Sequence, residues 1–250
     1  MRRIERNYEL IIEYLYSQTN ISTEDDNVLN PRIDAIGPIQ LSVENIVVNK
    51  RKQLKRLDVY EKRFRSILST PELNKLGLRS RDISELIDAG LVERVKQGYY
   101  TLPEISGEDS EAKMIGELYP DGVVCMSTAL FYYKYINRTP LMWDIAIDRN
   151  TSKARFNIDY PYVQPHYVEK SHLEYGVTKA DYEDCSLKIF DRDRLICECI
   201  KNENKMDREI YNKAIQSYIN DQKKNIANLM EYAVKRNIHK KVRERMSIWL

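Results

Sequence analysis

The segment from Thr70 to Leu102 limits the possible folds of this chain more than any other stretch. A helix is predicted to begin at Thr70-Pro71, because proline has no N–H to leave unpaired in a first helical turn. Gly77 predicts the end of this helix, since glycine accepts the left-handed conformation that closes many helices. A second helix is predicted from Ser80 to Ala89-Gly90. Its apolar residues recur at three- and four-residue spacing, at Ile83, Leu86 and Ile87.

A β-hairpin is predicted directly after these two helices. Val92 and Val95 come before the short turn Lys96-Gln97-Gly98, and the β-prone run Tyr99–Leu102 follows it. A glycine near the end of a short connection between two β-prone runs is typical of hairpins. Two short helices followed by a tight hairpin predict a winged helix-turn-helix.

The sequence as a whole predicts an α+β protein with three parts. Residues 1–49 are predicted to be a helical arm and an irregular connector, to which no role can be assigned. Residues 50–103 are predicted to be the winged helix-turn-helix, and the apolar spacing from Val43 to Leu68 predicts its first helix. A linker of turn-forming and acidic residues, PEISGED at 103–109, follows. Residues 110–250 are predicted to be a mixed α/β domain with a helical C-terminal tail.

Shorter elements are predicted within these parts. Residues 1–18 place their apolar side chains on one side of an amphipathic helix. Ser127 is predicted to cap a helix, STALFYYKYI. The remaining elements predicted before the tail are helices at Ser110–Tyr119 and Asp193–Lys201 and strands at Val123–Cys125, Leu141–Ile147, Arg155–Tyr162 and Leu187–Phe190.

Charge is distributed unevenly along the chain, although the net charge is only +2. Residues 50–100 contain 13 basic and 7 acidic side chains, whereas residues 1–49 contain 4 and 8. Residues 101–190 contain 9 basic and 14 acidic side chains, and residues 191–250 are basic again, with 14 basic and 9 acidic side chains. A basic module between acidic segments is typical of an element that binds phosphate groups.

Composition argues against several other classes of protein. No apolar run is long enough to span a bilayer and the N-terminus lacks a signal-peptide core, so a cytoplasmic protein with no membrane partner is expected. Four cysteines in 250 residues predict reduced thiols, and with no C-x-x-C pair and three histidines no metal site is expected. The eight glycines are scattered and form no phosphate-binding loop, so no nucleotide cofactor is expected.

In a helix-turn-helix, the second helix enters the major groove and its N-terminal residues contact base edges. The predicted base-contacting residues are those that start this helix and face outward: Arg79, Ser80, Arg81 and Ser84. An arginine in this position can donate two hydrogen bonds to guanine, which discriminates between bases by about 1–3 kcal/mol. Contacts to phosphates or the minor groove are predicted for side chains of the hairpin tip and the preceding helix: Lys96, Gln97, Lys52 and Lys55.

A protein-docking module is one alternative. Winged helices also bind proteins, and their basic face is then simply solvated. Three acidic residues on the second helix, Asp82, Glu85 and Asp88, reduce the positive field that DNA would meet.

A metal-dependent nuclease is another alternative. Asp191, Asp193 and Glu198 could hold magnesium while Lys201 steadies a phosphate. Such acids usually stand at the end of a strand, whereas Glu198 and Lys201 fall within a predicted helix, where an ion pair explains them. The chain is therefore expected not to be an enzyme.

Several segments in combination resemble the AbiEi family of antitoxins, from the type IV toxin–antitoxin (abortive infection) systems of bacteria. The segments are ISELIDAGLVERVKQGYYTLPE, GVVCMSTALFYYKYINRTPLMWDIAID, TSKARFNIDYPYVQPHYVE, DRDRLICECIKNENKMDREIYNKAIQSYI and the closing IWL. Many winged-helix proteins share the first segment, but the combination in this order is much more specific. The resemblance runs from about Lys50 to Leu250, so it carries nothing onto residues 1–49.

The resemblance implies an antitoxin that acts in phage defence and represses its own operon. Its winged helix would bind inverted repeats in operator DNA, with contacts from Arg79–Ser84 and from the hairpin at Lys96–Gly98. Its C-terminal domain would counter a co-encoded nucleotidyltransferase toxin without forming a stable complex with it. No catalytic residue is implied.

Overall fold

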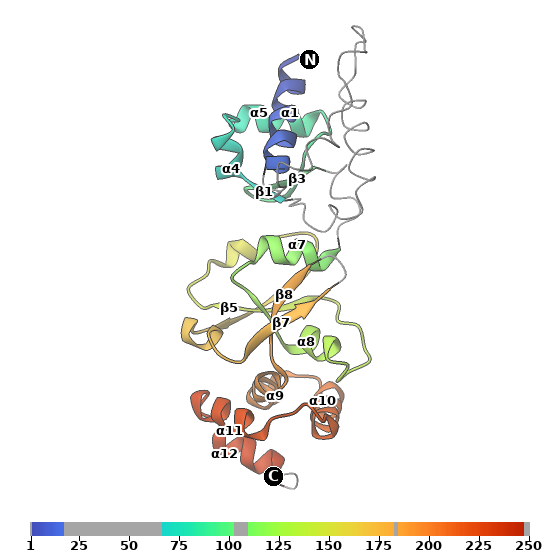
Figure 1. Cartoon of the computed structure of the whole chain (residues 1–250), viewed down its shortest axis with the longest axis vertical. Helices are drawn as coiled ribbons and strands as arrows, with labels where there is room; N and C mark the ends of the chain where they lie inside the picture. Colours follow the sequence, from blue (N-terminus) through green and yellow to red (C-terminus); the bar gives the residue numbers. More distant parts are fainter. Residues whose placement is uncertain (1, 18–66, 103–109, 183–184, 248–250) are drawn as a thin grey trace, which may run out of the picture. The chain divides into compact units, whose positions relative to one another are not determined.

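The computed structural model of the chain describes four stretches: residues 2–17, 67–102, 110–182 and 185–247. Within these stretches the protein is a mixed α+β structure with nine α-helices and two β-sheets (Figure 1). It divides into two compact units, Met1–Leu118 and Tyr119–Leu250. No helix of the described stretches has the length and apolar character needed to cross a bilayer.

The first unit combines four helices with a small sheet. Its elements are α1 (Arg2–Ser17), β1 (Ile67–Ser69), α4 (Thr70–Lys75), α5 (Ser80–Asp88), β2 (Glu93–Lys96), β3 (Tyr99–Thr101) and α7 (Glu111–Leu118). The strands are antiparallel in the order β1-β3-β2, so that Tyr100 lies between Leu68 and Arg94. Both helices and the hairpin predicted between Thr70 and Leu102 are confirmed.

Helices α4 and α5 end in the same way. Gly77 and Gly90 both adopt left-handed conformations, with φ of +83° and +70°. The N–H of Leu78 then donates to the carbonyl of Leu73 at 3.1 Å, and the N–H of Leu91 repeats this bond five residues back along α5 at 3.1 Å. These bonds pair carbonyls that a helix end would otherwise leave without partners.

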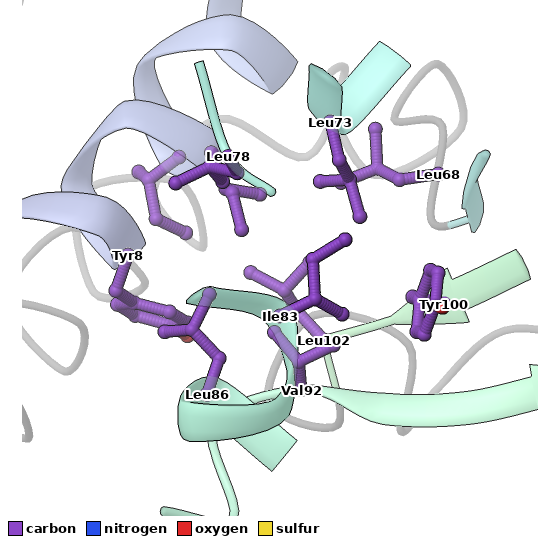
Figure 2. Packing of buried hydrophobic residues seen from close by; sticks show 11 residues of the cluster. Tyr8, Leu68, Leu73, Leu78, Ile83, Leu86, Val92, Tyr100 and Leu102 are labelled. Atoms are coloured by element: carbon purple, nitrogen blue, oxygen red, sulfur yellow. The ribbon is translucent and has the colours of Figure 1, made fainter. Parts of the chain in front are cut away.

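Helix α1 supplies part of the hydrophobic core of this unit. Figure 2 shows Tyr8 of α1 beside Leu86 of α5, in a cluster that also holds Ile83, Leu73 and Leu78. The other buried members of the cluster are Ile11, Ile12, Leu68, Val92, Tyr100 and Leu102. The arm and the module were predicted as separate parts that meet at residues 49 and 50. The compact unit instead includes α1, and it extends past residue 103 through α7.

The helix predicted from Val43 to Leu68 is wrong at its C-terminal end. Ile67 and Leu68 belong to strand β1, where Ile67 pairs with Thr101 of β3. Both side chains are buried, so packing and ladder hydrogen bonds outweigh the helical spacing of the sequence. Residues 43–66 lie outside the described stretches.

The second unit contains a five-stranded mixed sheet followed by four helices. Its elements are β4 (Val123–Val124), α8 (Met126–Tyr132), β5 (Trp143–Asp148), η2 (Lys153–Phe156), β6 (Val163–Val168), η3 (Lys170–Leu173), β7 (Val177–Asp181), β8 (Ser186–Phe190), α9 (Arg192–Lys201), η4 (Glu203–Lys205), α10 (Arg208–Asn220), α11 (Ile226–Lys235) and α12 (His239–Met246). The strand order is β6-β5-β4-β8-β7, and β5 pairs in parallel with β6. Helix α9 is buried almost throughout, and α8, α10, α11 and α12 all pack against it.

The strand predicted at Arg155–Tyr162 is wrong. Residues 153–156 form the short helix η2, and the strand that follows is β6, Val163–Val168. Parallel strands such as β5 and β6 cannot be joined by a hairpin, so the chain between them must cross over. Strand β7 was not predicted, because only Ala180 of its five residues is buried and its apolar pattern is weak.

The predicted cap at Ser127 is also wrong, because α8 begins at Met126 and Cys125 is its N-cap residue. The backbone N–H of Ser127 donates to the Asp144 carboxylate of β5 at 3.0 Å. A side chain distant in sequence thus performs the capping role that a local serine was expected to perform.

Candidate nucleic-acid interface

The N-terminal end of α5 presents the four predicted base-contacting residues. Ile83 and Leu86 are buried in the core, which leaves the opposite side of α5 in solvent. The exposed residues at this end are Arg79, Ser80, Arg81 and Ser84. The structure therefore brings all four predicted residues together on one face.

Arg81 is a freely accessible cation of this face, with 82% of its side chain exposed. Its Nε donates to the Glu85 carboxylate one turn later, at 3.2 Å. Exposed ion pairs of this spacing are worth about 0.3–0.5 kcal/mol, so a phosphate or a guanine can displace Glu85 at little cost. Arg81 is thus able to reach a nucleic acid.

Asp82 lies at the same end of α5 but points inward. Its carboxylate accepts a hydrogen bond from the backbone N–H of Arg79 at 2.9 Å and a longer one from Asn7 Nδ2 at 3.4 Å. The Arg3 guanidinium of α1 also donates to it. The hydrogen bond from Arg3 is the largest of the influences that hold the pKa of Asp82 below its ordinary value, and the same contact raises the pKa of Arg3.

The hairpin differs from expectation at Lys96. This residue is only 6% exposed, and its ammonium lies 4.4 Å from the centre of the Tyr99 ring. The Lys96 side chain is therefore not accessible for the phosphate contact that was predicted at the hairpin tip. Gln97 is exposed as predicted, whereas Lys52 and Lys55 lie outside the described residues.

Arg94 is a cation that the sequence-based reasoning did not select. It is exposed on β2, with its guanidinium 5.9 Å from the centre of the Tyr100 ring. Simple alternation would not have found it, because Glu93 and Arg94 are both exposed and the strand register shifts between Arg94 and Lys96. On the hairpin, Arg94 takes the place of Lys96 as the accessible basic residue.

The carboxylates of the nuclease alternative are engaged inside the second unit. Asp191 caps α9 by accepting from the backbone N–H of Arg194 at 2.7 Å. Asp193 accepts from the Tyr218 hydroxyl at 2.7 Å, and burial raises the pKa of its carboxyl group. Among the residues that the structure describes, no group of three or more histidine, cysteine or acidic side chains is arranged to hold a metal ion.

Glu198 is buried between two arginines. Arg236, the C-cap residue of α11, donates to both of its oxygens, at 2.6 and 3.0 Å, and Arg194 contacts Oε1 at 2.8 Å. This pairing joins α9 to α11 and leaves the carboxylate no exposed edge for a magnesium ion. The arrangement of Asp191, Asp193 and Glu198 fits a structural role.

A scan against protein-family models and a search of curated proteins both found no match to this chain. The resemblance to the AbiEi antitoxins therefore depends on the sequence segments alone.

Proposed function

We propose that this chain is a DNA-binding autorepressor and antitoxin of a type IV toxin–antitoxin system, with its winged helix-turn-helix in the first unit. In this assignment α1, α4 and α5 are the three helices, α5 is the recognition helix and the β2–β3 hairpin is the wing. The observation that carries the proposal is the exposed, arginine-bearing start of α5, which lies opposite the buried Ile83 and Leu86. That geometry allows the end of a helix to enter a major groove.

Operator binding is tested with a fluorescently labelled duplex that covers the promoter upstream of the reading frame. We expect the wild-type chain to bind this duplex more tightly than an unrelated duplex of equal length, with an affinity that falls as salt rises. The Arg81→Ala, Ser84→Ala double variant is expected to lose most of the preference for the promoter duplex. A matched control is Ser171→Ala in the second unit, combined with Arg208→Ala, since both residues are exposed. Equal binding of both duplexes by the wild-type chain would refute sequence-specific repression.

The antitoxin role comes from the family resemblance and is assigned to the second unit. We propose that this unit counters a co-encoded nucleotidyltransferase toxin in the cytoplasm, without a stable complex between the two proteins. The test is co-expression of the neighbouring nucleotidyltransferase gene in a host whose growth it arrests. Restored growth, with no co-purification of the two proteins, is the expected result. Arrest that persists at full expression of this chain would contradict the antitoxin role.

A protein-docking module remains the alternative for the first unit. It predicts a captured protein partner and no salt-dependent affinity for any duplex, so the binding experiment separates the two functions.

A further inference from the structure

Two side chains of α1 contact the start of α5. Arg3 and Asn7 are four residues apart and therefore on the same side of α1, and both donate to the Asp82 carboxylate. The third donor is the backbone N–H of Arg79, the N-cap residue of α5. The Arg3 side chain remains 57% exposed while that of Asp82 is 12% exposed, so the pair is partly open to solvent at the first turn of α5.

The charges at this end of α5 show why the contact with α1 matters. At the N-terminal end of α5, the two cations Arg79 and Arg81 are matched by the two anions Asp82 and Glu85, while the third anion of the helix, Asp88, lies at its other end. These four side chains alone give the N-terminal end of the helix no net side-chain charge. Arg3 adds one positive charge beside Asp82, so the five side chains at this end of the helix sum to one positive charge. Since phosphates repel an uncompensated carboxylate, this compensation favours the approach of DNA to this end of α5.

We propose that Arg3 is a positioning residue for DNA binding, which neutralises Asp82 and keeps its carboxylate turned toward α1. This inference depends on the proposed DNA-binding function. It gives α1, which the family resemblance does not cover, a part in DNA recognition. Arg3 acts through Asp82 and is not itself assigned a contact with phosphate.

Replacement of Arg3 by alanine isolates this effect. We expect Arg3→Ala to bind the promoter duplex about tenfold more weakly at about 0.1 M salt, because an unpaired carboxylate then lies close to the DNA backbone. The slope of log affinity against log salt is expected to stay the same, because no phosphate contact is lost. The matched control is Arg208→Ala, which removes one exposed positive charge from the second unit. It is expected to bind like the wild type.

The decisive variant combines Arg3→Ala with Asp82→Asn. Asparagine retains an oxygen that accepts from the Arg79 N–H, but it carries no charge to repel phosphate. The double variant is therefore expected to recover wild-type affinity to within about twofold, and Arg3→Lys is expected to retain it. Circular dichroism and the melting temperature of each variant check that the first unit remains folded.

Three results would overturn the inference. Equal binding by Arg3→Ala and the wild type would show that Asp82 needs no compensation. Weak binding that Asp82→Asn does not restore, with a salt slope reduced by about 0.9, would show that Arg3 contacts a phosphate directly. A wild-type chain that binds no duplex would refute the proposed function together with this inference, whereas the first two results leave the proposed function intact.

Discussion

Ile11→Ala tests whether α1 is an integral part of the first unit. The Ile11 side chain is 0% exposed and belongs to the core cluster with residues of α4, α5 and β3. The substitution removes three carbon atoms, which at about 0.8 kcal/mol each gives a loss of roughly 2.4 kcal/mol. The cavity that remains adds to this loss, so we expect the first unit to be destabilised by about 2–5 kcal/mol.

Hydrogen exchange measured by mass spectrometry is a suitable assay, because it reports on each unit separately. A loss of about 2.4 kcal/mol corresponds to roughly 60-fold faster exchange of amides that exchange through opening of the unit. Peptides from Ile67–Leu102 should show this acceleration, whereas peptides from α9 in the second unit should not. Glu13→Ala is the control, since Glu13 is exposed on the same helix.

One result would refute this reasoning. If Ile11→Ala leaves the exchange of Ile67–Leu102 within about twofold of the wild type, the buried contacts of α1 contribute little stability. Helix α1 would then add little to the stability of the first unit.

Three further predictions concern other parts of the chain. Glu198→Gln leaves two buried arginines short of a counter-charge and should destabilise the second unit by about 3–5 kcal/mol in a thermal melt, whereas the exposed Glu231→Gln should change little. Lys96→Gln should leave the salt slope of DNA binding unchanged, because the Lys96 ammonium is buried against a tyrosine ring; a slope reduced by about 0.9 would contradict this placement. At pH 8, iodoacetamide should label Cys185 first in the native protein, since it is the more exposed thiol. The other three thiols are those of Cys125, Cys197 and Cys199, and burial raises their pKa and keeps them protonated. Labelling of these three at a rate similar to that of Cys185 would argue against their burial.

Features that depend on neighbouring residues were predictable from the amino-acid order. The helix ends at Gly77 and Gly90 follow from the conformational freedom of glycine, which needs no distant partner. The inward and outward sides of α5 follow from its three- and four-residue spacing, so the exposure of Arg81 and Ser84 was also predictable. For the same reason the α+β class and most helices of the second unit were correct.

Features that depend on distant contacts were not predictable from the amino-acid order. Ile67 and Leu68 keep the spacing of a helix, but pairing with β3 places them in a strand. A basic residue in a turn is usually solvated, and only the Tyr99 ring and the surrounding packing explain why Lys96 is buried. The core position of Ile11 likewise depends on a contact between α1 and residues more than fifty positions later.

The start of α5 depends both on neighbouring residues in the sequence and on a distant contact. Local order places Arg79, Arg81 and Asp82 in one helical turn and predicts which of them face solvent. It cannot show that Arg3, seventy-nine residues before Asp82, donates a hydrogen bond to the Asp82 carboxylate. The range of the interaction is the physical reason. Helical spacing acts over three or four residues along the chain, whereas a charge acts through space on whatever the fold brings beside it.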